Sequence, residues 1–220
     1  MIPEVERDVE NREDPAEELV NVYDAIGNVI GARVRSEAKA SGLAVGAVNA
    51  LVVNGRREVL LQRRPADKEN GGLWDKTVGG HVTAGEDFGA ALLREAGEEL
   101  FDDGSSPRVK LASSDDEFAR ALGRADLSRE VVLRRVGFQR NLRDVRHVPG
   151  GGLRNVLYHV AIYAGRTEVS HDAFRPQRGE IEELRYFAPA DIDRMLLIGD
   201  LTPNMAFLWL THAYGLLGLV

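Results

Sequence analysis

The stretch that decides the fold reads Gly80-His81-Val82-Thr83-Ala84-Gly85-Glu86 and, after seven intervening residues, Arg94-Glu95-Ala96-Gly97-Glu98-Glu99. Its last three carboxylates, on Glu95, Glu98 and Glu99, stand at spacings i, i+3 and i+4, and residues so spaced share one face of a helix. Acidic side chains crowded within one turn repel one another. Divalent cations would neutralise them, and hard oxygen ligands suit Mg²⁺ or Mn²⁺. The stretch therefore predicts a metal site on a helix.

Two further features argue against the competing interpretation, an acidic helix face that only meets solvent. A glycine pair, Gly79-Gly80, precedes the acids, and Glu86 and Arg94 stand at fixed offsets from them. The stretch resembles the Nudix box, written G-x5-E-x7-R-E-U-x-E-E-x-G-U with U an apolar residue. Six positions match, namely Gly80, Glu86, Arg94, Glu95, Glu98 and Glu99, and three depart from the pattern, namely Ala96, Phe101 (for glycine) and Asp102 (for an apolar residue).

The departures fall at the end of the predicted helix and leave the acids in place. Glycine is the usual residue past the last turn of a helix. We therefore expect Asp103-Gly104 to end a helix that begins near Asp87 and runs past Phe101 by about a turn. Leu92 and Leu100 fall on an adjacent face, which should pack on a sheet and leave the acids at the edge of the core.

The resemblance implies a fold of the α/β class, an α/β/α sandwich with a mixed β-sheet. It implies a hydrolase that cleaves a diphosphate linkage in a nucleoside diphosphate linked to another moiety, or in a related diphosphate. The implied cofactor is Mg²⁺ or Mn²⁺, and the implied partner is a small-molecule diphosphate substrate. The implied metal ligands are Glu95, Glu98, Glu99 and the backbone carbonyl of Gly80 or of neighbouring Gly79, because glycine lets the backbone approach a ligand closely.

The resemblance also implies roles in catalysis. Arg94 and Glu86 match positions that orient the helix acids and brace the loop. The general base in this family is an acid of the box or one on a later loop. Glu98 therefore competes with three acids of one loop, among which we choose Glu180 over Glu182 and Glu183. The alternative for these three is a solvated loop before a strand.

Cationic side chains just ahead of the glycine pair are candidates for substrate binding. Arginine pairs bidentately with phosphate, so Arg64 and Lys68, with Arg63 beside them, suit the distal diphosphate oxygens. The alternative is a set of exposed charges at a strand end. Two further groups have an open assignment between substrate contact and ordinary packing or solvation: the arginines Arg135, Arg140, Arg143 and Arg146, and the aromatic residues Trp74 and Phe138.

The run from Gly72 to Val82 looks most like the branch of the family that includes isopentenyl diphosphate isomerase. The catalytic cysteine position of that enzyme is Gly79 here, and two of its metal-binding histidine positions fall on Lys39 and Ala44. Only His81 matches its histidine ligands, and a loop histidine is also a common structural hydrogen-bonding group. The intact acid set favours hydrolysis. The isomerase and a non-catalytic ligand-binding module remain as alternatives.

Composition bounds the remaining properties. The 220 residues, 44% of them hydrophobic, suit one domain with a sizeable core, and the absence of cysteine excludes disulfides and a cysteine nucleophile. Residues 1–18 carry eight acids and two arginines and predict a mobile acidic tail, followed by a single domain over 19–220 with an insertion around 104–130. Residues 104–155 carry eleven bases against six acids. With no signal segment evident, a cytoplasmic setting is expected.

Sequence patterns also predict the order of elements. Strands are expected over 19–23 and 29–34 as an N-terminal hairpin, then over 45–53, 58–62, 131–145, 154–164 and 184–187, with helices over 115–122 and 189–197. Thr202-Pro203 starts a C-terminal helix whose apolar residues, 205–220, are short for a bilayer span. We expect it to pack on the domain or in a homodimer interface, with no membrane contact. No feature suggests nucleic-acid binding.

Overall fold

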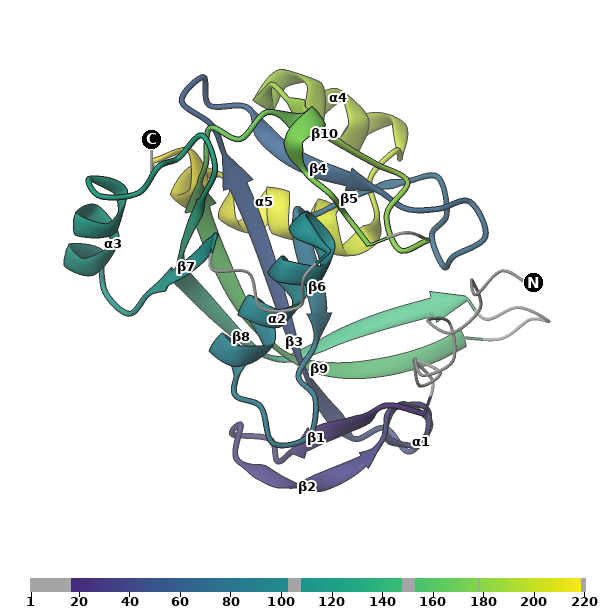
Figure 1. Ribbon diagram of the computed structural model, residues 1–220. Helices are drawn as coiled ribbons and strands as arrows, with labels where there is room; N and C mark the ends of the chain where they lie inside the picture. Colours follow the sequence, from purple (N-terminus) through teal and green to yellow (C-terminus); the bar gives the residue numbers. More distant parts are fainter. Residues whose placement is uncertain (1–16, 103–107, 148–152, 178, 219–220) are drawn as a thin grey trace, which may run out of the picture.

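A computed structural model describes residues 17–102, 108–147, 153–177 and 179–218. They form a ten-stranded mixed sheet with the order β10-β4-β3-β9-β8-β7, to which β1 and β6 add on β3, β2 adds on β1, and β5 adds on β4 (Figure 1). The pairs β3–β9 and β7–β8 are parallel and the others are antiparallel. The predicted α/β class with a mixed sheet is confirmed.

The strands are β1 Leu19–Tyr23, β2 Val29–Val34, β3 Ala44–Val53, β4 Val59–Arg63, β5 Trp74–Asp75, β6 Val78–His81, β7 Val109–Ala112, β8 Val131–His147, β9 Leu153–Arg166 and β10 Glu183–Phe187. The helices are α1 Arg35–Ala40, α2 Phe88–Phe101, α3 Asp115–Leu122, α4 Pro189–Ile198 and α5 Pro203–Leu217, with a 3-10 turn at His171–Ala173.

The central strand β3 is buried on both faces of the sheet. Leu51 and Val53 belong to one apolar cluster, and Ala50 and Val52 to another, because successive side chains of a strand point to opposite faces. Helices α4 and α5 contribute to the first cluster and α2 to the second. The two helical layers on either side of the sheet are those of the predicted sandwich (Figure 1).

The end of α2 differs from the prediction. The helix stops at Phe101, and the next residue, Asp102, adopts the left-handed conformation (φ 53°, ψ 38°) with its backbone N–H directed to the carbonyls of Glu98 and Gly97. Aspartate tolerates this conformation better than most residues because its short side chain is polar. The expected extra turn is wrong, and the residues Asp103-Gly104 that were expected to end the helix lie outside the described part of the chain.

The N-terminal hairpin forms as predicted, with β1 also pairing with the start of β3 at Val22↔Val45. The sequence placed Glu18 in a mobile acidic tail, but in the structure this residue has defined contacts. Its carboxylate lies 3.1 Å from Arg35 Nη1 and accepts a hydrogen bond from Thr83 Oγ1 at 3.0 Å. Ordered contacts thus begin before Leu19. The rest of the predicted tail, residues 1–16, lies outside the described residues.

The C-terminal helix packs on the sheet, which is the first of the two positions expected for it, the domain itself and a homodimer interface. Met205, Leu208 and Trp209 are buried in the same cluster as β3, and Trp209 Nε1 donates to Asp193 Oδ1 at 2.7 Å. In the described parts of the chain, no helix has the length and apolar character needed to cross a membrane.

Candidate functional site

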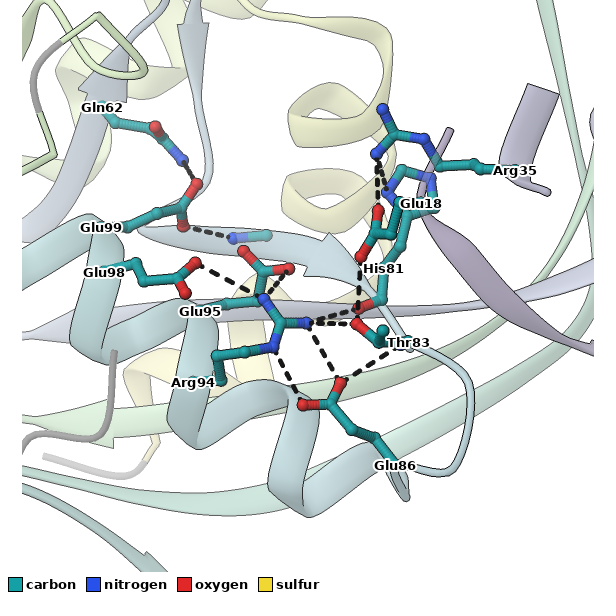
Figure 2. Close-up of polar contacts among 11 residues, drawn as sticks. Glu18, Arg35, Gln62, His81, Thr83, Glu86, Arg94, Glu95, Glu98 and Glu99 are labelled. Carbon is teal, nitrogen blue, oxygen red and sulfur yellow. Dashed lines mark hydrogen bonds and ion pairs between the residues drawn. The ribbon is translucent and has the colours of Figure 1, made fainter. Parts of the chain in front are cut away.

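Helix α2 carries the predicted acids past the short strand β6 (Figure 2). Asp87 caps its first turn, accepting a hydrogen bond from the backbone N–H of Ala90 at 2.8 Å. The apolar side of the helix is buried against the sheet. The carboxylates of Glu95, Glu98 and Glu99 lie close together, as their spacing predicts (Figure 2). Those of Glu95 and Glu99 lie against the glycines of β6.

Arg94 links the helix to the loop before it. Its guanidinium donates to both carboxylate oxygens of Glu86, from Nε at 2.9 Å and from Nη2 at 3.1 Å, which is bidentate geometry. Nη1 lies 3.0 Å from Glu95 Oε1 and 3.4 Å from Glu98 Oε2. One guanidinium therefore contacts three carboxylates of the box.

The charges of this pair are mutually stabilised. Burial alone would lower the pKa of Arg94, but the hydrogen bonds of Glu86 and the charges of Glu95, Glu86 and Glu98 raise it above its ordinary value. Burial also opposes the charge of Glu86, yet the hydrogen bonds and charge of Arg94 hold the pKa of that carboxyl below its ordinary value. Both side chains are charged at neutral pH.

Glu95 and Glu99 have the opposite electrostatics. Glu99 accepts hydrogen bonds from the Gly79 backbone N–H at 2.8 Å and from Gln62 Nε2 at 3.3 Å. Burial and then the charge of Glu95 nevertheless raise the pKa of Glu99. Burial likewise raises the pKa of Glu95, with a smaller contribution in the same direction from Glu98, although Arg94 acts against it. Burial is thus the main reason that the charged forms of these two carboxyls are disfavoured.

The donor set fits a divalent cation. Three carboxylates supply hard oxygen ligands, and a cation would stabilise the charged forms of Glu95 and Glu99, which burial disfavours. Within the described residues, no three carboxylate or imidazole groups are arranged as a finished metal site. Arg94 contacts Glu95 and Glu98, so its guanidinium orients two of these three carboxylates.

The glycine pair gives the acids room beside β6. A Cβ built on Gly80 would overlap the carboxyl group of Glu95, and one built on Gly79 would overlap the end of the Lys76 side chain. Glycine at both positions therefore lets an acid and a base lie directly against the strand.

A second polar cluster surrounds Asp75, four residues before Gly79. Asp75, which is buried, accepts from Thr202 Oγ1 at 2.7 Å and lies 3.1 Å from Lys76 Nζ and 3.5 Å from Arg64 Nη1. Burial would raise the pKa of Asp75, but the charge of Lys76, the hydrogen bond of Thr202 and the charge of Arg64 lower it. The charge of Lys76 also acts on Glu99.

Comparison with known proteins agrees with this geometry. Residues 44–106, which span β3 to the end of α2, match the family model of the NUDIX domain. The chain contains a NUDIX domain. An uncharacterized Nudix hydrolase of Nostoc sp., all7351, is 40% identical over 85 residues, which are 38% of this chain and 50% of that protein. Isopentenyl-diphosphate Delta-isomerase 2 of Photorhabdus laumondii is 32% identical over 85 residues, 38% of this chain and 48% of that protein. The chain thus spans about half the length of these relatives.

Solved structures share the fold of the NUDIX domain and its surrounding elements. DR0079 from Deinococcus radiodurans superposes with a TM-score of 0.59 at 18% identity, covering 87% of this chain and 96% of that one. The NUDIX domain of Shewanella oneidensis NrtR, solved in complex with ADP ribose, gives a TM-score of 0.50 at 15% identity, covering 84% and 99%.

The predicted substrate-binding cations lie at the end of β4 (Arg63) and on the loop after it (Arg64 and Lys68), and already have protein partners. Arg63 Nε donates to the carbonyl of Gly72 at 3.2 Å, and Arg64 Nε donates to the carbonyl of Glu69 at 2.7 Å. Lys68 Nζ lies 3.0 Å from Glu180 Oε1.

Glu180 belongs to a loop that is attached to the end of α2. The backbone N–H of Gln177 donates to the Glu98 carbonyl at 3.1 Å, and that of Arg175 donates to the Leu100 carbonyl at 2.8 Å. The structure thus brings Glu180 to the same side of the domain as the cations, in contact with Lys68. Of the other two loop acids, Glu182 lies 3.9 Å from Arg63 Nε and Glu183 pairs with Arg185.

The remaining candidate residues are two aromatic residues, His81 and four arginines. Trp74 is buried with its ring 4.6 Å from that of Phe187, and Phe138 packs edge-on to Phe88 at 5.2 Å, so both have the packing role that was the alternative. His81 Nδ1 lies 3.3 Å from Arg35 Nη1. Among the four arginines, Arg140 donates to the Ile26 carbonyl and Arg143 is exposed. The charge of Arg135 acts to lower the pKa of Tyr163, which burial raises. The side chain of Arg146 lies outside the described part of the chain.

Several residues of the site were not predicted from the sequence: Gln62, Asp75, Lys76, Glu18 and Asn21. Glu18, Asn21 and Gln62 are distant from the box in sequence, so no local pattern points to them. Asp75 and Lys76 stand four and three residues before Gly79, and this charged pair was the one available signal.

Proposed function

We propose that this protein is a hydrolase that uses Mg²⁺ or Mn²⁺ to cleave a diphosphate linkage, in a nucleoside diphosphate linked to another moiety or in a related diphosphate. The observation that carries the proposal is the acid set of α2. Glu95 and Glu99 lie beside a glycine pair, and burial raises the pKa values of both carboxyls. The Nudix hydrolases among the relatives support the same reaction class.

We assign Glu95, Glu98, Glu99 and the backbone carbonyl of Gly80 to the cation. When bound, the cation supplies charge neutralisation of the diphosphate oxygens and lowers the pKa of water. Arg94 and Glu86 keep the acids in register through the contacts at 2.9–3.4 Å. Arg64 and Lys68, on the neighbouring loop, would bind the distal phosphate oxygens through charge-assisted hydrogen bonds.

Two carboxylates are candidates to accept the proton of the attacking water, Glu98 and Glu180. Glu98 lies on the helix beside the other acids, with 35% of its side chain exposed. Glu180 faces the same loop as the substrate cations, with 46% of its side chain exposed. A general base must reach the attacking water, and both carboxylates are accessible to solvent. The base is the residue whose Gln variant removes the acidic limb of the pH–rate profile.

Isomerisation of isopentenyl diphosphate is the second candidate function, because one relative is an isopentenyl-diphosphate Delta-isomerase. The geometry opposes it. The sequence contains no cysteine, the position of the family's cysteine is Gly79, and the space a side chain would need there is filled by Lys76. The third candidate, a binding module without catalysis, is opposed by the complete acid set.

The test is incubation of the protein with Mg²⁺ and a panel of diphosphates in H₂¹⁸O, with chromatography and mass spectrometry of the products. The panel comprises ADP-ribose, dinucleoside polyphosphates, nucleoside triphosphates, coenzyme A and isopentenyl diphosphate. ADP-ribose is included because the Shewanella oneidensis domain was solved with it. Cleavage between phosphates, with one ¹⁸O in a product and loss in Glu98→Gln, is expected. Dimethylallyl diphosphate as the product, resolved by retention time since its mass equals that of isopentenyl diphosphate, would establish the isomerase.

A further inference from the structure

The loop between β6 and α2 is held by β1, a strand that precedes the NUDIX domain in the chain. The backbone N–H of Ala84 donates to the Leu19 carbonyl at 2.9 Å, and that of Asn21 donates to the Val82 carbonyl at 3.2 Å. This loop carries Glu86, the partner of Arg94. The strand therefore borders the part of the box that sets the direction of the guanidinium.

The side chain of Asn21 adds two contacts to the same loop. Its Oδ1 accepts a hydrogen bond from the Gly85 backbone N–H at 3.1 Å, and its Nδ2 donates to the Glu86 carbonyl at 2.9 Å. The residue is 5% exposed. Only an amide supplies an acceptor and a donor in this geometry: aspartate lacks the donor, and an apolar residue lacks both. Gly85 has φ +87°, so its conformation, which favours glycine, is stabilised from outside the loop.

A second connection runs from β1 to Arg94 through Thr83. The Thr83 hydroxyl donates to Glu18 Oε1 at 3.0 Å and accepts from Arg94 Nη2 at 3.1 Å. Glu18 is in turn fixed by Arg35 at 3.1 Å (Figure 2). The Arg94 guanidinium is thus oriented by two residues of the loop. One is Glu86, whose backbone is held by Asn21, and the other is Thr83, whose hydroxyl is held by Glu18.

We infer that Asn21 is a positioning residue of the divalent-cation site, acting through the Glu86 backbone, with Thr83 as a second, parallel support. The inference rests on the proposed function. Because Arg94 contacts Glu95 and Glu98, a loop that shifts with loss of Asn21 displaces the guanidinium and, with it, two of the ligand carboxylates. The side chain of Asn21 contacts Gly85 and Glu86, so its effect on the ligand carboxylates is transmitted through Glu86 and Arg94.

The experiment is titration of the full chain with Mn²⁺, followed by electron paramagnetic resonance of the free ion, without substrate. Asn21→Ala and Asn21→Asp are compared with Asn155→Ala, a change at an exposed asparagine of β9. We expect Asn21→Ala to weaken Mn²⁺ binding by about 10–100-fold, as for other residues that support metal ligands, with Asn155→Ala unchanged. The Tm without metal is recorded for each variant.

A second pair of variants covers the case in which Asn21 variants do not fold. Thr83→Ser keeps the hydroxyl and should bind Mn²⁺ within about twofold of wild type, whereas Thr83→Val keeps the shape alone and should lose about tenfold. Equal affinities for Ser and Val, or a lower Tm for Asn21→Ala with unchanged affinity, would overturn the inference and leave the proposed function intact. Absence of Mn²⁺ binding by the wild type would overturn both.

Discussion

The acid cluster comprises Glu86, on the loop before α2, and Glu95, Glu98 and Glu99, on α2 itself. Its loop end, at Glu86, and its strand end, at Glu99 beside β6, balance their charge in different ways. At the loop end, Glu86 is paired with Arg94, and its pKa is lowered. At the strand end, Glu99 receives the hydrogen bonds of Gly79 and Gln62 and the partial effect of Lys76, but burial raises its pKa. Two glutamates of one motif thus have opposite electrostatics.

This difference separates two tasks within one motif. The loop end is complete without a cation and keeps the helix and loop in register. The strand end is incomplete, because a carboxylate that has lost water and lacks a full counter-charge is destabilising. We infer that the binding energy of a cation is concentrated where the protein itself leaves negative charge uncompensated, and that the loop end determines geometry more than affinity.

The largest expected effect comes from the strand end. Glu99→Gln keeps the side-chain shape and an acceptor for the Gly79 N–H, but removes the charge. We expect kcat to fall by on the order of 10³-fold, as for loss of a group that stabilises transition-state charge, while the Tm without metal rises. Steady-state kinetics and calorimetry measure the two. Asp116→Asn, an exposed acid of α3, is the control. A Tm below that of wild type would contradict the comparison.

The loop end should respond in the opposite direction in stability and more weakly in rate. Glu86→Gln removes the bidentate partner of Arg94, which is partly buried and retains its charge. We expect a lower Tm without metal and a decrease in kcat of about 10–100-fold, since the acids themselves remain. If this variant lost as much activity as Glu99→Gln and gained Tm, the distinction between the two ends would not hold.

Acid–base titration sharpens the same comparison. Burial raises the pKa of Glu95 to about 7 and that of Glu99 to about 8. Carboxyls with raised folded-state pKa values stabilise the protein below their ordinary pKa, and that contribution is lost as pH rises through the folded values. Glu86 and Asp75, with lowered pKa values, contribute constant stability in this range.

We therefore expect the Tm of the metal-free protein to fall between pH 6 and 9 by on the order of 5 °C, and Mg²⁺ to restore most of it. Scanning calorimetry at each pH, with and without Mg²⁺, measures this. Glu99→Gln should flatten the metal-free profile and Glu86→Gln should not. A Tm that is constant across this range in wild type would show that the strand end carries no excess charge.

The acids of the site were predictable because metal chemistry restricts them. Glu95, Glu98 and Glu99 need one helix face, and the helix periodicity gives their positions. Local signals also indicated β1 and β2, which flank a turn where Asp24 accepts hydrogen bonds from the next residues, and in the structure Ser114 caps α3 by accepting from the Glu117 N–H. The structure matched these elements at the residues predicted.

Elements without a local signal were missed. β5 and β6 have two and four residues, and β6 contains the glycine pair, so neither shows the alternation of a strand. Asn21 and Gln62 reach the site through the pairing of β1 and β4 with other strands, which the chain order does not reveal. The early end of α2 depended on Asp102 adopting a left-handed conformation, which sequence pattern assigns to glycine first.

The smallest expected effect lies outside the acid cluster, in the pair of Lys68 and Glu180. The two groups are 36% and 46% exposed, and such exposed pairs contribute about 0.2–1 kcal/mol. If Lys68 binds substrate oxygens, Lys68→Met should raise KM several-fold and leave the Tm unchanged. Glu180→Gln should instead lower kcat if it is the base, and leave KM unchanged or lower, because it frees Lys68 for the substrate. A double-mutant cycle on KM then measures how strongly the two groups compete. Additive effects would show that Lys68 and Glu180 act separately and that their contact in the free protein is incidental to substrate binding.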